Sequence, residues 1–253
     1  MIIVTVSTQR SGTKLLGTCF GSGTQIKPLG EIFNPDRIAL GCYSQFLKAE
    51  GYRTLQELPA DIVLDRYFAH IFHTWRPIHF DLMFNQLEIP CLSWNPFPGF
   101  FMYGYLRSRG ALVISLERDV VDTYVSGKFL ERTGVAHGYV ADPQHAIEPL
   151  VLDANDFTNY ARTVRWHQDQ LHLAMANYPN FHIINYTDLA ASAKLPDNLL
   201  SFIMDWASKY QLNIDRKYIQ IHPSLARKTA VNYADAFSNI GEIRDIAKIQ
   251  SAP

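Results

Sequence analysis

The sequence predicts an α/β fold with three layers, in which a central parallel sheet lies between helices. Three short runs rich in β-branched and apolar residues are each bounded by turn or polar residues and are too short for helices: Ile2–Val6, Ala111–Leu116 and His182–Asn185. We expect these runs to be buried strands. Segments with a helical apolar period lie between them, and strands that alternate with helices are typical of an α/β/α domain.

The expected elements follow one another along the chain in a simple order. Ile2–Val6 leads through the polar segment Ser7–Lys14 into a helix that starts near Leu15. Apolar residues at helical spacing predict further helices around residues 64–75, 121–129, 157–175 and 199–210. No repeat and no flexible linker interrupts the chain, so we expect one domain over residues 1–253.

Two segments lack a clear apolar period. Residues 142–153 contain Pro143 and Pro149, and the tail from Ile221 onward is polar with several Lys and Arg residues. We expect both to be surface segments that cover a site.

The composition excludes several classes of protein. Hydrophobic residues make up 47% of the 253 residues, so the chain folds around a core and general disorder is excluded. Lys and Arg number 23 against 24 Asp and Glu, a formal net charge of -1, so no overall positive field favours nucleic acid or anionic lipid. Any site for an anion must therefore be local.

The cysteine content and the hydropathy of the chain indicate the cellular compartment in which we expect the protein. Cys19, Cys42 and Cys91 are scattered and odd in number, which argues against a disulfide framework and against a structural zinc site. The N-terminal residues resemble no secretory signal, and the apolar stretch 97–106 is too short and too interrupted to span a membrane. We expect a cytoplasmic protein.

The segment that follows the first strand has the features of an anion site. Gly12 allows close backbone approach, Ser11 and Thr13 carry hydroxyls, Arg10 and Lys14 are cations, and a helix N-terminus follows. It is not a Walker A motif, because Ser7 replaces the leading Gly and the end reads Gly-Thr-Lys. A capped helix start with cations in solvent is the alternative interpretation.

This segment resembles the 5'-phosphosulfate loop of sulfotransferases that use 3'-phosphoadenosine-5'-phosphosulfate (PAPS). The resemblance rests on Gln9-Arg10-Ser11-Gly12-Thr13-Lys14-Leu15-Leu16, with Gln9 in place of a frequent Pro and Lys14 in place of a second Ser or Thr. It implies a P-loop-like fold and contacts to the phosphosulfate from Arg10, Ser11, Gly12, Thr13, Lys14 and Leu15.

A second pair of polar residues follows a later strand. Arg118 comes after Ala111–Leu116, at the edge of a sheet where α/β folds bind ligands, and Ser126 lies two turns into the next expected helix. Taken alone, an exposed ion pair between Arg118 and Asp122 is the alternative. After the first motif, the pair resembles the site for the 3'-phosphate in the same superfamily.

Other segments resemble the bacterial Stf0 (trehalose 2-sulfotransferase) family. They are Gly30–Phe33, Glu131–His137, Asn185–Leu189 and Ser238–Glu242. The resemblance implies sulfuryl transfer from PAPS to a hydroxyl of a carbohydrate or glycoconjugate, with release of 3'-phosphoadenosine-5'-phosphate (PAP) and without a metal. A homodimer is a state that occurs in the resembling family.

The implied chemistry assigns roles to individual residues. Arg10 would stabilise charge on the leaving phosphate, and Glu31 would accept the proton of the acceptor hydroxyl. Arg227 and Lys228 in the tail would close over the nucleotide. The alternatives are a surface carboxylate or a salt-bridge partner of Arg10 for Glu31, and a solvated charge pair for the two tail residues.

Two other functions stay open at the level of sequence. One is a P-loop kinase of related architecture, which requires ATP and magnesium and which the missing Walker A motif disfavours. The other is a module that binds PAP without catalysis. The histidines His70 and His73 have a metal-like spacing but are flanked by apolar residues, so a structural role is favoured. Trp94 is a candidate for stacking, and the role of His137 is open.

Overall fold

The computed structural model describes residues 1–21, 26–39, 41–74, 77–87, 98–134, 149–191, 195–212, 214 and 236–251. The strands are β1 (Ile2–Ser7), β2 (Lys27–Pro28), β3 (Ile78–Met83), β4 (Leu112–Glu117) and β5 (Phe181–Asn185). The helices are α1 (Thr13–Gly21), α2 (Tyr43–Glu50), α3 (Tyr52–Gln56), α4 (Ala60–Thr74), α5 (Pro98–Ser108), α6 (Val120–Thr133), α7 (Ala154–Ala174), α8 (Tyr186–Ala190), α9 (Asp197–Lys209) and α12 (Ile240–Ser251), with a 3-10 turn over Phe84–Gln86.

The five strands form one parallel sheet in the order β2-β3-β1-β4-β5. β1 is central and pairs with β3 and β4, so that Thr5 lies beside Asp81 on one side and Ile114 on the other. Because every pairing is parallel, the carboxyl ends of all five strands meet at one edge of the sheet. The loops that follow the strands therefore gather at that edge.

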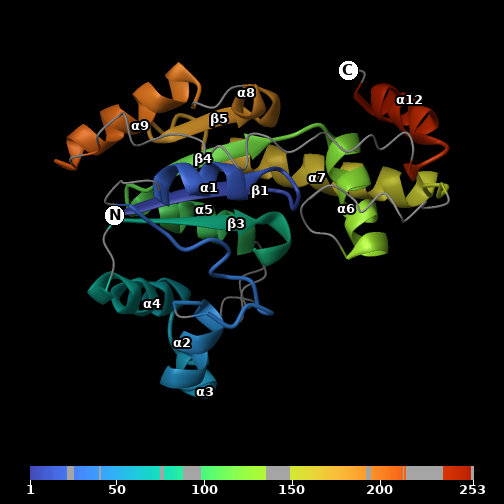
Figure 1. The fold of residues 1–253 in the computed structure, drawn as a ribbon. Coiled ribbons are helices and arrows are strands. Elements are labelled where there is room, and N and C mark those ends of the chain that lie inside the picture. Colours follow the sequence, from blue (N-terminus) through green and yellow to red (C-terminus); the bar gives the residue numbers. More distant parts are fainter. Residues whose placement is uncertain are drawn as a thin grey trace.

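Helices cover both faces of the sheet (Figure 1). α1, α8 and α9 pack on one face, on Ile3 of β1 and on the alternate residues Leu112, Ile114 and Leu116 of β4. α4, α5 and the end of α7 pack on the other face. The expected α/β/α architecture is thus confirmed. The helix after β1, α1, lies on the opposite face from α5, which follows β3, and from the end of α7, which leads into β5. Helices that leave neighbouring strands towards opposite faces open a crevice for ligands at the carboxyl edge.

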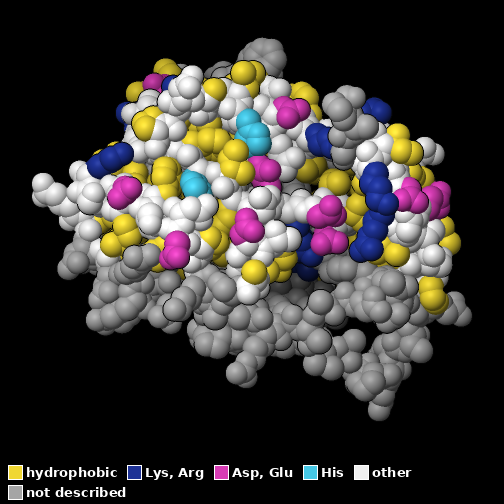
Figure 2. Space-filling model, turned by 90° about the horizontal axis from the view of Figure 1, so that it is seen from above, with side chains coloured by type: hydrophobic (Ala, Val, Ile, Leu, Met, Phe, Trp, Pro, Cys, Tyr) yellow, Lys and Arg dark blue, Asp and Glu magenta, His cyan; other side chains and the backbone are white. Residues whose placement is uncertain are grey.

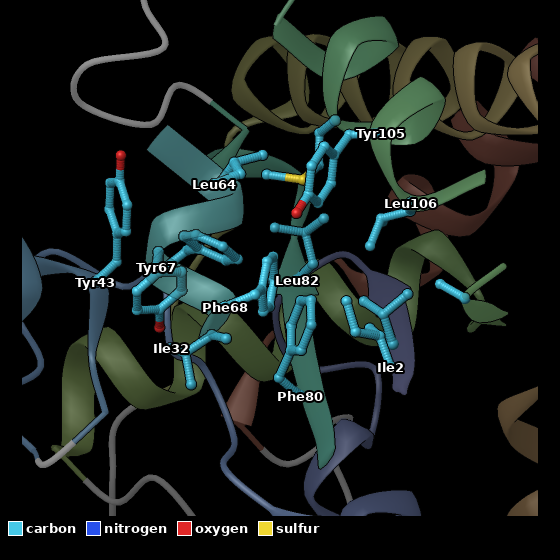
Figure 3. Packing of buried hydrophobic residues seen from close by; sticks show 14 of the residues in the cluster. Ile2, Ile32, Tyr43, Leu64, Tyr67, Phe68, Phe80, Leu82, Tyr105 and Leu106 are labelled. Atoms are coloured by element: carbon cyan, nitrogen blue, oxygen red, sulfur yellow. The ribbon is translucent and has the colours of Figure 1, made fainter. Parts of the chain in front are cut away.

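The core beneath α4 and α5 is rich in aromatic rings. Phe80 of β3 lies against Phe33 and Phe68, with ring centroids 5.7 and 5.8 Å apart. Tyr67 of α4 donates a hydrogen bond to the carbonyl of Gly41 at 2.6 Å, which satisfies its buried hydroxyl. Figure 3 shows Tyr67, Phe68 and Phe80 close together where α4 packs on β3. This packing fixes the loop 29–39, which follows β2.

A third apolar cluster lies beyond the carboxyl edge of the sheet. There α6, the start of α7 and α12 pack together through Val125, Phe157 and Ile243, all of them fully buried. Leu150 and Phe237 form an isolated parallel bridge at the same place. This cluster holds α6, and hence Ser126, next to the end of β4.

The structure contains elements that the sequence analysis did not predict. The expected strands and helices are present, but the strands β2 and β3 and the helices α2, α3, α5 and α8 were missed, and β3 lies between β1 and β2. The expected burial is wrong for His182–Asn185, because β5 is an edge strand in which only Ile184 is buried. The tail is not polar throughout: residues 240–251 form α12, and it buries Ile243 against α6 and α7. Of the two segments that we predict to cover a site, residues 142–148 and 221–235 lie outside the described part, so this stays a prediction.

Candidate functional site

The loop between β1 and α1 is a tight turn. Arg10 has a φ of 67° and Gly12 a φ of 93°, both in the left-handed region. The Ser11 hydroxyl donates a hydrogen bond to the carbonyl of Thr8 at 2.8 Å, and the amide of Leu15 donates to Gly12 at 2.9 Å. The turn ends where α1 begins, so the positive end of the α1 dipole faces the loop.

A tyrosine that follows the edge strand β5 packs on this turn. Tyr186 is the first residue of α8, directly after β5. A Cβ placed on Gly12 would lie 2.5 Å from its ring, so only glycine allows the ring to approach this closely. The guanidinium of Arg118 lies 4.4 Å from the centroid of the same ring, a cation–π contact. Tyr186 thus joins the two motifs, a role that the sequence analysis did not assign.

Arg10, Arg118 and Ser126 form a connected group at the ends of β1 and β4. Nη1 of Arg118 donates to the carbonyl of Arg10 at 2.8 Å, and Nε of Arg10 donates to the hydroxyl of Ser126 at 3.1 Å. The ion pair of Arg118 with Asp122, which was the alternative interpretation, is long, at 4.0 Å. Nε of Arg118 is buried and has no hydrogen-bond partner within the described part of the chain. The structure therefore brings these three predicted residues together.

The start of α6 positions Ser126. The Asp119 side chain caps the helix by accepting a hydrogen bond from the amide of Asp122 at 3.0 Å. Ser126 then lies on the inward face of the helix and is buried, as is Thr123 one turn earlier. A short polar side chain at this position reaches the loop after β1 because β4 is the neighbour of β1.

Glu31 belongs to a second hydrogen-bonded group, on the β2 and β3 side of the same edge. Its Oε2 accepts hydrogen bonds from Nδ2 of Asn34 at 3.1 Å and from Nε2 of Gln86 at 2.6 Å. Gln86 is buried, and its Oε1 accepts from the amide of Met83 at 3.3 Å, which sets the direction of the amide. The half-buried Glu31 carboxylate is thus fixed by two amide donors. Gln86 was missed because it follows the unrecognised strand β3.

The other predicted residues have less distinct surroundings. Thr13 is buried at the start of α1, Lys14 is exposed, and Leu15 packs beside the cluster under α9. Arg227 and Lys228 lie outside the described residues, as do Trp94 and His137.

Two buried titratable residues lie on β3 beneath the loop of Glu31. Burial raises the pKa of Asp81 to about 7, and the charge of Glu31 adds to the rise while Arg37 opposes it. Burial lowers the pKa of His79 to about 3, so its ring is neutral. Nε2 of His79 lies 2.9 Å from the Thr5 hydroxyl and 3.7 Å from Oδ1 of Asp81. The sequence analysis did not identify these two side chains on β3.

On the face shown in Figure 2, basic and acidic side chains are interspersed, and neither sign of charge predominates. Within the described ranges, no group of three His, Cys, Asp or Glu residues is arranged to hold a metal ion. No helix in this part of the chain has both the length and the apolar character needed to cross a bilayer.

No family profile matches the chain, and no curated protein does. Among solved structures, the chain is similar to retinol dehydratase in complex with androsterone and the inactive cofactor PAP. The two chains are 14% identical, and the TM-score is 0.43 over 98% of this chain and 80% of that one. A similarity of this size does not identify what this chain does.

Proposed function

We propose that this protein is a sulfotransferase that moves a sulfuryl group from PAPS to a hydroxyl of a carbohydrate or glycoconjugate. The observation that carries the proposal is the group formed by Arg10, Arg118 and Ser126. Two motifs that lie 108 residues apart in the chain meet through a hydrogen bond at the carboxyl edge of the sheet. Their order and types are those of the 5'-phosphosulfate and 3'-phosphate motifs that the sequence resembles.

The residues present fit a nucleotide with two phosphate groups. The buried Nε of Arg118 has no hydrogen-bond partner in the described part of the chain, and the Ser126 hydroxyl lies 3.1 Å from Nε of Arg10, which is bonded to Arg118 through its carbonyl. Guanidinium and hydroxyl groups are donors that suit a phosphate. The turn over residues 8–12 and the start of α1 supply a second position for an anion. Arg118 and Ser126 would hold the 3'-phosphate, and Arg10 with the loop would hold the phosphosulfate.

Arg10 and Glu31 have different roles in the transfer step. The acceptor oxygen forms a bond to sulfur, the bond from sulfur to the bridging phosphate oxygen breaks, and the acceptor proton passes to Glu31. Arg10 stabilises the negative charge that develops on the departing 5'-phosphate, as a cation that does not itself lose a proton. The two amide donors on Oε2 hold Glu31 and leave Oε1 for the acceptor.

Calorimetric titration with PAP in the presence of EDTA tests the proposal, with ATP plus magnesium as the comparison. We expect PAP to bind without metal and more tightly than ATP. Binding of ATP that requires magnesium, with no binding of PAP, would favour a kinase instead. PAP binding without transfer from PAPS to any of a set of sugars would reduce the proposal to a nucleotide-binding module.

A further inference from the structure

We propose that the hydroxyl groups of Thr8 and Tyr160 form a donor pair that binds the sulfuryl group of PAPS. Neither residue belongs to the two motifs that the sequence resembles, and Tyr160 comes from α7, which follows both of them in the chain. The inference deepens the proposed function and rests on it, because PAPS is the ligand of the proposed site.

The contact between α6 and α7 fixes the position of Tyr160. Asp153 caps α7 by accepting a hydrogen bond from the amide of Asp156 at 2.9 Å. The Tyr124 hydroxyl of α6 donates to Oδ2 of Asp156 at 2.9 Å, and the Tyr124 ring lies 5.4 Å from the ring of Tyr160, one turn further along α7. Tyr124 precedes Ser126 by two residues. One helix pair therefore carries both Ser126 and Tyr160.

This helix pair contacts the loop after β1 at two places. The Ser126 hydroxyl accepts a hydrogen bond from Nε of Arg10 at 3.1 Å. The Tyr160 hydroxyl lies 3.4 Å from Oγ1 of Thr8, the first residue after β1. The carbonyl of Thr8 is also engaged, since it accepts from the Ser11 hydroxyl at 2.8 Å. Two hydroxyl groups thus meet where the proposed phosphosulfate loop leaves the sheet.

The donor pair has one O–H group available for a ligand. Each hydroxyl carries one proton, and the hydrogen bond between Thr8 and Tyr160 uses only one of the two. Within the described part of the chain, neither hydroxyl makes another hydrogen bond. Both side chains are partly exposed, so a bound group can reach them. Their mutual hydrogen bond is long, and an anionic oxygen is a stronger acceptor than a second hydroxyl.

The face of the sheet on which Thr8 lies favours the sulfuryl group as the ligand. Thr8 continues the alternate spacing of Val4 and Val6, which pack in one cluster with Phe33 of the loop that carries Glu31. In the proposed transfer, the sulfur lies between the phosphate held by the loop after β1 and the acceptor at Glu31. A donor on the Glu31 side of that loop therefore meets the sulfuryl oxygens.

A hydrogen bond to a sulfuryl oxygen would have two effects on the bound nucleotide. It limits rotation of the sulfuryl group and keeps the sulfur turned towards the acceptor, which is the orientation that an in-line transfer needs. It also adds affinity for PAPS that PAP cannot gain, because PAP has no sulfuryl group. The donor pair should thus make the protein prefer PAPS over PAP.

Calorimetric titration with PAPS and with PAP, both without an acceptor, tests the donor pair in the double variant Thr8→Val, Tyr160→Phe. The variant removes both hydroxyls and keeps the ring that packs on Tyr124. We expect the affinity for PAPS to fall about 5- to 10-fold and that for PAP to change by less than about twofold. Each single variant should lose the same or less, because one hydroxyl can replace the other as donor.

The matched control is Tyr52→Phe, which removes the hydroxyl of an exposed tyrosine on α3 and should leave both affinities unchanged. Equal losses for PAPS and PAP in the double variant would place the contact on the 5'-phosphate and overturn the sulfuryl assignment. Unchanged affinities for both nucleotides would overturn the donor pair while the proposed function stands. If the wild type binds neither nucleotide, the proposed function is wrong, and the donor pair is wrong with it.

Discussion

Arg118 is held on two sides before any ligand arrives. Its guanidinium lies on the Tyr186 ring and donates to the carbonyl of Arg10, which together fix a side chain that otherwise has many rotamers. A cation fixed in this way loses little conformational entropy when it binds an anion. The structure thus predicts that Arg118 contributes strongly to nucleotide affinity.

Arg118→Ala should weaken PAP binding by about 10- to 100-fold, because a charge-assisted hydrogen bond contributes about 1.5–3 kcal/mol. Ser126→Ala should weaken it by a smaller factor, about fivefold, since only a neutral hydroxyl is removed. Calorimetry at constant ionic strength measures both. Asp122→Asn is the matched control, because its contact with Arg118 is long, and its affinity should equal or exceed that of the wild type. Unchanged affinity in both site variants would exclude the 3'-phosphate assignment.

Gly12 is the second residue whose replacement has a definite expected result. Gly12→Ala places a methyl group 2.5 Å from the Tyr186 ring at a φ of 93°, so either the turn or the ring must move. We expect a loss of about 1–3 kcal/mol in the free energy of unfolding, measured by urea denaturation. Gly104→Ala is the control: this helical glycine has nothing within 4 Å of an added Cβ, and the change should stabilise by about 0.5–1 kcal/mol. Equal effects of the two changes would show that Tyr186 does not pack on Gly12.

At the scale of elements, α12 connects the end of the described chain to the site. It packs on α6 and α7 through Ile243, and Arg165 of α7 donates to the carbonyls of Ala247 and Gln250 near the α12 C-terminus. The same cluster contains Tyr124 and Val125, which precede Ser126 on α6. α12 therefore supports the position of the proposed phosphate contact.

Ile243→Ala should lower the free energy of unfolding by about 3 kcal/mol, because it removes a fully buried side chain from this cluster. Ile249→Ala, in the same helix but 76% exposed, should change it by less than about 0.5 kcal/mol. Thermal or urea unfolding of the two variants provides the comparison. Similar small losses would mean that α12 does not pack on α6 and α7 in solution.

Buried strands whose only interior polar residues are small hydroxyl residues could be predicted from the sequence, and the buried strand with titratable residues inside could not. β1 has Thr5 and β4 has Ser115 inside, with Glu117 only at the end, so their runs were recognised. β3 reads Ile-His-Phe-Asp-Leu-Met, and all six residues are buried. His79 contacts Phe20 of α1 and Thr5 of β1, and Asp81 is buried as well, which no local pattern reveals. β2 has only two residues, and its position depends on pairing with β3.

The candidate site likewise contains residues that could be predicted from the sequence and residues that could not. Arg10, Arg118 and Ser126 could be found because each lies at a fixed offset from a recognisable strand, and the structure brings them together. Tyr186 and Gln86 contact the site only because distant strands end at one edge, which requires the sheet order. Asp81 could not be identified, because its burial and its proximity to Glu31 arise from tertiary packing alone.

At the scale of the molecule, two buried groups on β3 make stability depend on pH in opposite directions. The pKa of Asp81 is raised from 3.8 to about 7, so the native state retains a proton that the unfolded chain has already released. The stability from this group is complete below pH 3.8 and is lost as the pH rises towards 7. Asp81→Asn should therefore gain stability relative to the wild type between pH 5 and 8, by up to a few kcal/mol.

His79 has the opposite effect on the acidic side. Its pKa is lowered from 6.5 to about 3, so below pH 6.5 the unfolded chain binds a proton that the native state excludes. The stability from this group is complete above pH 6.5 and falls as the pH drops towards 3, by about 1.4 kcal/mol for each pH unit over which only the unfolded state binds the proton. Urea denaturation of the wild type and His79→Leu at pH 4, 5, 6 and 7 measures the effect. We expect the difference in unfolding free energy to move in favour of His79→Leu as the pH falls, whatever its value at pH 7. A difference that stays constant with pH would show that the imidazole is protonated in the native state and that Asp81 is its charged partner, which would also contradict a neutral Asp81.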